Sequence, residues 1–133
     1  GVKRSVRQHD EVITSIDFPI VRGWQGYSKV GVRNAMVISV ASACLVADHD
    51  KANVRLALGS VGPTIIRCRE AEAWLASSQD LTAGQTISLD VANEFGKRAA
   101  AESSPIDDHR STAEYRRHAI SVLASRLLRK AYQ

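Results

Sequence analysis

The chain has few cysteines, no long apolar run and no initiating methionine. Its two cysteines, Cys44 and Cys68, are too few for a disulfide framework or a four-thiolate cluster. We therefore expect two packed thiols in a reducing, cytoplasmic compartment. No apolar run could span a bilayer, and no signal peptide opens the chain. The first residue is Gly1 and the only methionine is Met36, so we expect a fragment or a processed product.

The signatures of a complete catalytic site are also missing. The sequence holds no nucleophile elbow, no Walker loop, no Rossmann fingerprint and no His or Cys set with metal spacing. Its eight glycines never cluster into a phosphate-binding loop. Asp107 and Asp108 form a carboxylate pair, but they precede a predicted helix, whose N-terminus favours negative charge. The histidines lie in polar segments where we expect solvated side chains: His9, His49, His109 and His118.

What is present is the composition of one globular domain. Hydrophobic residues make up 44% of the 133 residues and charged residues 24%. A chain of this length can bury roughly two-thirds of its unfolded surface. The net charge of +4 permits an acidic or nucleic-acid partner without requiring one. Residues 1–10 are basic and predict a mobile lead-in, so we assign a single domain to residues 11–133.

The front half of the chain has the two-residue period of β-strands. Residues 11–18 alternate apolar and polar side chains, which predicts a strand. Residues 24–32 contain two glycines and predict a loop with a short strand. The apolar run 36–47 is too short for its length to distinguish helix from strand, but its β-branched residues and the polar turn 48–53 favour a hairpin. With a further strand over 54–61, the front half predicts an antiparallel meander.

The back half has helical spacing. Residues 68–77 predict a first helix without a clear N-cap, and residues 89–99 predict a second. Ser111 and Glu114 form a capping box for a third helix. This helix is predicted to present four residues on one face: Tyr115, Ala119, Leu123 and Leu127. The fold class is therefore α+β, a meander of three to four strands packed against three helices.

Two groups of basic residues could bind an anionic partner. Lys29 and Arg33 lie four residues apart in a glycine-bearing loop, where they could grip an anion or line the edge of a cofactor. The last helix is also positive, although a solvated face is the simpler interpretation. An acidic protein or RNA bound by this helix is the alternative function, but no aromatic platform accompanies it and we expect no nucleic acid. The basic residues are Arg116, Arg117, His118, Arg126, Arg129 and Lys130.

Four ordered segments cover nearly the whole chain after residue 10. They are Asp10-Glu11-Val12-Ile13; Tyr27-x-Lys29-Val30-Gly31-x-Arg33-x-Ala35-Met36; Leu56 to Pro63 with Arg67 and Ala71 to Leu75; and Pro105-Ile106-Asp107-Asp108-x-Arg110 to Arg117. Together they resemble the C-terminal domain of the FAD-carrying subunit of molybdenum hydroxylases, the xanthine, carbon monoxide and aldehyde dehydrogenases. The resemblance implies the same meander and helices that the periodicity predicts.

The resemblance also implies a function. In this family the flavin subunit receives electrons from a molybdopterin site through iron–sulfur clusters and passes them to an acceptor. The implied cofactor is FAD, held mostly by the N-terminal FAD-binding domains of the same subunit. The implied partners are those domains, a molybdopterin large subunit and a 2Fe-2S small subunit. This domain is expected to cover the flavin, to contribute to subunit contacts and to be inactive alone. The sequence assigns neither the substrate nor the acceptor.

The resemblance gives roles to particular residues. Lys29 matches a lysine that family members place near the isoalloxazine ring, although an exposed loop lysine is an equal interpretation. Arg33 is expected to support the loop. Val37 departs from the family, which often has an acidic residue there. Trp24 and Tyr27 are expected to form an exposed apolar patch where neighbouring domains are missing. Four residues are expected to fix the last helix to the sheet: Asp108, Arg110, Tyr115 and Arg116.

Overall fold

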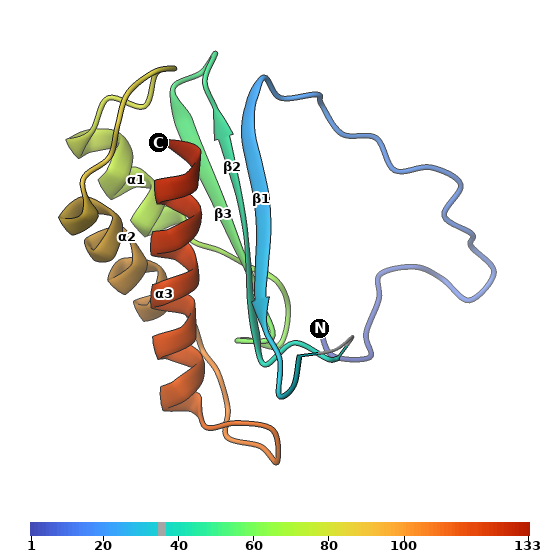
Figure 1. Cartoon of the computed structure of the whole chain (residues 1–133). Helices are drawn as coiled ribbons and strands as arrows, with labels where there is room; N and C mark the ends of the chain where they lie inside the picture. Colours follow the sequence, from blue (N-terminus) through green and yellow to red (C-terminus); the bar gives the residue numbers. More distant parts are fainter. Residues whose placement is uncertain (35–36) are drawn as a thin grey trace.

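The front half of the chain forms an antiparallel sheet and the back half forms helices, as predicted (Figure 1). The structure is a computed structural model that describes residues 1–34 and 37–133. The elements in this part are β1 (Gly23–Val30), β2 (Ala41–Asp48), β3 (Asn53–Gly59), β4 (Ile66–Arg67), α1 (Arg69–Ser78), α2 (Leu89–Ala101) and α3 (Ala113–Ala131). The strand order is β1-β2-β3-β4, all antiparallel. No helix of the described part is long and apolar enough to cross a membrane.

The sheet has one covered face and one open face. Leu45 stands opposite Leu56 in the register, and both side chains are completely buried beneath the helices. Tyr27 stands opposite Cys44, and both are exposed on the other face. This separation follows from the two-residue period of a strand, which sends successive side chains to opposite faces. The expectation that Cys44 is a packed thiol is therefore wrong, whereas Cys68 is buried.

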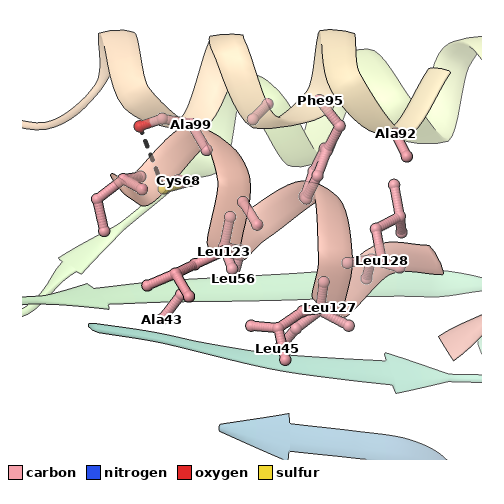
Figure 2. Packing of buried hydrophobic residues seen from close by; sticks show 14 of the residues in the cluster. Ala43, Leu45, Leu56, Cys68, Ala92, Phe95, Ala99, Leu123, Leu127 and Leu128 are labelled. Atoms are coloured by element: carbon pink, nitrogen blue, oxygen red, sulfur yellow. Dashed lines mark hydrogen bonds between the residues drawn. The ribbon is translucent and has the colours of Figure 1, made fainter. Parts of the chain in front are cut away.

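The core lies between the covered face of the sheet and the helices (Figure 2). Helix α3 crosses β1 and β2, helix α1 packs on β3, and α2 lies on the far side of α3 from the strands. Phe95 of α2 is completely buried, and a side chain of this size stabilises the fold by about 1.5–3 kcal/mol. Gly96 brings α2 close to α3, because a Cβ there would lie 2.2 Å from the carbonyl oxygen of Ser121.

The helix starts differ from the prediction at one position. Thr112, not Ser111, is the N-cap of α3, and its hydroxyl accepts a hydrogen bond from the third residue of the helix. The N–H of Ser111 instead donates to Asp108, which closes the preceding turn. Helix α1 has no side-chain cap at Cys68, as expected. The carboxylate of Glu102, at the end of α2, accepts hydrogen bonds from the first turn of α1 in its place.

Two predictions for the first thirty residues are wrong. Residues 11–18 form no strand, because no described strand pairs with them. Residues 23–30 form a full strand rather than a loop with a short strand. The glycine at position 26 does not break this strand; it leaves room for the ring of Trp24. Apolar side chains of the unpaired segment are left exposed: Val12, Ile13, Ile16, Phe18 and Ile20.

Other side-chain predictions are confirmed in part. Tyr27 is 61% exposed, as the expected apolar patch requires, but Trp24 packs against the core. His49 is half-buried beside Tyr132, with ring centroids 5.8 Å apart, so the prediction of a solvated side chain is wrong there. The start of the apolar run at Met36 lies outside the described residues. Tyr115 is exposed, whereas its three predicted partners on the same helix face are buried.

Candidate functional site

Three connections of the chain meet at the end of the sheet where β1 finishes. They are the loop between β1 and β2, the turn between β3 and β4, and the connection between α2 and α3. They enclose a cleft of about 510 Å³. One part of its wall is apolar, from Ile38, Pro63 and Ile106. The other part is charged: Asp108, Arg110 and Arg116. A cleft with an apolar wall and a few polar groups is typical of ligand sites.

Arg116 holds the three connections together. Its side chain is buried, with 5% of its surface exposed. One terminal nitrogen donates hydrogen bonds to the carbonyl oxygens of Val40, at 2.7 Å, and Ser60, at 2.9 Å. The other terminal nitrogen donates to Oδ1 of Asp108 at 2.7 Å. The expectation that Arg116 and Asp108 fix the last helix to the sheet is confirmed.

Asp108 is held as a carboxylate by the backbone around it. The N–H of Arg110 donates to Oδ1 at 2.8 Å and the N–H of Ser111 at 3.0 Å. The Arg110 N–H first, then the Arg116 guanidinium and the Ser111 N–H, lower the pKa of Asp108 to about 2. Asp107 accepts a hydrogen bond from the N–H of Ala113, the first residue of α3, as expected for a carboxylate before a helix. The side chain of Arg110 is exposed and faces the cleft, so it does not join helix to sheet.

Lys29 lies in strand β1 rather than in the predicted loop, and Arg33 lies in the loop that follows this strand. Nζ of Lys29 donates a hydrogen bond to the carbonyl oxygen of Val37 at 2.9 Å. Arg33 and Val37 both line a smaller cavity of about 320 Å³, which shares Ile38 and Arg110 with the main cleft. The loop between β1 and β2 is therefore anchored twice: Lys29 binds the carbonyl oxygen of Val37, and Arg116 binds that of Val40. Residues 35 and 36, which belong to the motif that resembles the flavin subunits, lie outside the described residues.

Tyr27 was predicted as part of an apolar patch, but its hydroxyl also adds a polar group beside this loop. Its hydroxyl lies 3.5 Å from Oγ of Ser39, on the loop that Lys29 holds. Hydrogen bonding to Ser39 and then Ser42, together with the charge of Lys29, lowers the pKa of Tyr27. Positions 27 and 29 are two residues apart, so their side chains share a strand face. Recognition of a full strand at residues 23–30 would have revealed this pairing.

The site has the groups to contact a ring but not those to hold a metal or a chain of phosphates. No set of His, Cys, Asp or Glu in residues 1–34 and 37–133 could hold a metal ion. A Cβ at Gly59 would meet the side chain of Ser42, and one at Gly62 would meet Ile66. These glycines near the cleft therefore face packed side chains and not an open space for phosphates. The apolar wall, together with exposed cations such as Arg33 and Arg110, could contact a planar, electron-rich group. The residues thus fit the ring end of a cofactor.

The antiparallel meander, its helical cover and the loop cleft define an α+β domain. Residues 27–131 match the family model described as the CO dehydrogenase flavoprotein C-terminal domain. The chain belongs to this family, the C-terminal domain of the FAD-binding subunit of molybdenum hydroxylases.

Two relatives agree with this assignment. The chain is 25% identical over 123 residues to the glyceraldehyde dehydrogenase medium chain of Sulfolobus acidocaldarius, covering 90% of this chain and 41% of the relative. It is also 25% identical over 130 residues to a putative xanthine dehydrogenase FAD-binding subunit of Escherichia coli, covering 93% and 42%. The chain therefore spans about two-fifths of the length of these relatives.

Two solved structures have the same fold. The CO dehydrogenase from Oligotropha carboxidovorans aligns with a TM-score of 0.64 and 24% identity, over 80% of this chain and 36% of that chain. The quinoline 2-oxidoreductase from Pseudomonas putida 86 aligns with a TM-score of 0.68 and 18% identity, over 85% and 38%.

Proposed function

We propose that this domain forms one wall of the FAD site in a cytoplasmic molybdenum hydroxylase and covers the flavin ring. The observation that carries the proposal is the double attachment of the loop between β1 and β2. Lys29 binds its Val37 carbonyl on the open side, and Arg116 binds its Val40 carbonyl from the core. A loop held at both sides can present Arg33 and Ile38 to a ring in a fixed position.

The positive charges at this loop are what the domain would contribute to the flavin site. FAD, when bound, accepts electrons from one redox partner and delivers them to another. Lys29 and Arg33 are exposed cations at the loop, and positive charge beside the ring would stabilise negative charge that develops on it. The guanidinium of Arg116 is turned toward Asp108 and two backbone carbonyl oxygens, so the cations nearest the ring would be Lys29 and Arg33.

The first 22 residues are consistent with a domain that works inside a larger assembly. They hold no helix or strand, and their large apolar side chains include Phe18, which is 79% exposed, and Ile20, which is 95% exposed. Burying these side chains would be favourable in proportion to the apolar area removed from water. The proposed partners are the FAD-binding domains of the subunit, with a molybdopterin large subunit and a 2Fe-2S small subunit completing the enzyme.

A flavin titration tests the proposal. FAD is titrated against this chain alone and against the chain joined to the FAD-binding part of the subunit, with flavin fluorescence as the readout. We expect binding only in the joined form, and about tenfold weaker binding for Lys29→Ala. The matched control is Lys97→Ala, which removes an exposed lysine from α2 and should leave the affinity unchanged. Equal affinities for the two variants would contradict the role of Lys29.

A further inference from the structure

A basic groove lies on the other side of β1, away from the flavin loop. It has a volume of about 470 Å³ and runs between β1 and the last turns of α3. Its lining includes Trp24 and Gly26 of β1 and three cations of the helix: Arg126, Arg129 and Lys130. All three cations are exposed, and none makes an ion pair with any other residue of the described part.

These cations are arranged as one positive surface. Their spacings of three and four residues place them on a single helix face. The negative end of the helix dipole favours cations in the last turn, which explains the presence of Arg129 and Lys130 without any partner. It does not account for Arg126, which stands four residues before Lys130, where two like charges repel each other. A negatively charged partner in the groove would remove this repulsion.

The strand beside the groove has an unpaired edge. Within residues 1–34 and 37–133 the sheet ends at β1, whose only neighbour is β2. The N–H of His49 donates to the carbonyl oxygen of Arg22 at 3.0 Å. Because hydrogen-bonded and free positions alternate along an antiparallel ladder, the backbone groups of Gly23, Gln25, Tyr27 and Lys29 point away from β2.

This edge lacks most of the features that normally block strand addition. The eight residues of β1 include no proline, and Lys29 is their only charged side chain. Unblocked edges of this length readily accept an extended segment from another chain as an additional strand. Such a segment would place every second side chain over the groove and the others over the open face of the sheet.

We propose that β1 and the groove together bind an extended acidic segment of a partner protein as a fifth strand. Its acidic side chains, at every second position, contact Arg126, Arg129 and Lys130. The dimensions agree, because alternate residues of a strand are about 6.7 Å apart. Arg126 and Lys130 are about 6 Å apart along the helix axis. This proposal does not depend on the flavin role, since the groove and the flavin loop share no cation.

The chemistry of the groove favours a protein segment over RNA. Single-stranded RNA is bound by cations together with exposed aromatic rings on which the bases stack. The ring of Trp24 is packed against Gly26 and the core, and the other aromatic residue at the groove, Tyr27, projects onto the open face of the sheet, away from the three cations. The unpaired backbone of β1, by contrast, offers alternating N–H and carbonyl groups that match another peptide chain.

The test uses the complete chain and a labelled ten-residue peptide in which glutamate alternates with valine and threonine. Fluorescence anisotropy measures its affinity, and a peptide with lysine in place of glutamate is the charge control. We expect Arg126→Glu to weaken binding about tenfold, with a loss of affinity as salt is added. Arg117→Glu makes the same charge change on an exposed position of α3 outside the groove, and it should change the affinity less than twofold, roughly the effect of a distant charge.

A second measurement tests strand addition itself. On peptide binding, amide hydrogen exchange should slow at Gln25, Tyr27 and Lys29, whose N–H groups face the new strand. Gln25→Pro should abolish binding because it removes one of these donors without removing a β1–β2 hydrogen bond. If that variant fails to fold, the exchange measurement on the unaltered chain decides. The proposal is overturned if these amides stay unprotected, if Arg117→Glu matters as much as Arg126→Glu, or if oligouridine competes with equal affinity.

Discussion

Replacing Arg116 by methionine removes the guanidinium that joins three segments while keeping a side chain of similar length. The carbonyl oxygen of Val40 then loses a charged donor in a buried place, and that of Ser60 loses one in a partly buried place. A hydrogen bond to a charged group contributes about 1.5–3 kcal/mol, so the two bonds together contribute about 3–6 kcal/mol, with the smaller share from the partly buried bond to Ser60. The contact with Asp108 is left out of this sum because that carboxylate is exposed to solvent.

We therefore expect Arg116→Met to destabilise the domain by about 3–5 kcal/mol. For a chain of this length that corresponds to a fall in Tm of roughly 10–20 °C. Urea unfolding followed by the fluorescence of Trp24 and Trp74 measures the change. Arg117→Met is the control, because Arg117 is exposed and its loss should cost less than about 0.5 kcal/mol. A loss below about 1 kcal/mol for Arg116→Met would refute the claim that this side chain joins the three segments.

Three further predictions follow from single contacts. The lowered pKa of Asp108 contributes stability that is present above pH 3.8 and is lost as the pH falls to about 2; Asp108→Asn should flatten that part of the stability curve in acid titrations. Gly96→Ala should destabilise the domain by about 1–3 kcal/mol in urea unfolding, because its Cβ would lie 2.2 Å from the backbone oxygen of Ser121 and force α2 from α3; equal or higher stability would contradict this packing. Cys44 should react with N-ethylmaleimide in the native state, whereas burial raises the pKa of Cys68 to about 12 and should prevent its labelling until unfolding, as mass spectrometry can show.

Sequence periodicity predicted the fold well because most elements carry their own pattern. The alternation in residues 54–61 and the helical spacing in residues 89–99 both place apolar side chains on the covered side of a single element. Such patterns need no knowledge of the neighbours. The same reasoning failed for residues 11–18, because alternation shows that a segment could form a strand but not that a sheet edge lies beside it.

Side-chain partners across the fold were harder to predict. The role of Arg116 came from the resemblance to the flavin subunits, and the structure confirms it through acceptors 56 and 76 residues away. Local sequence patterns such as periodicity cannot predict contacts between residues so far apart in the chain. The cap of α3 moved by one residue because Asp108 already binds the N–H of Ser111, which leaves Thr112 to begin the helix. His49 was misjudged for the same reason, since Tyr132, which covers it, lies at the other end of the chain.

The central claim is that the loop between β1 and β2 lies against the flavin ring. Amide hydrogen exchange of the assembled subunit, with and without FAD, tests it directly. We predict that FAD slows exchange in residues 27–34 and 37–40 but not in the hairpin turn 49–52, which lies at the opposite end of the sheet. Unchanged exchange in both loop segments on FAD binding would contradict the account.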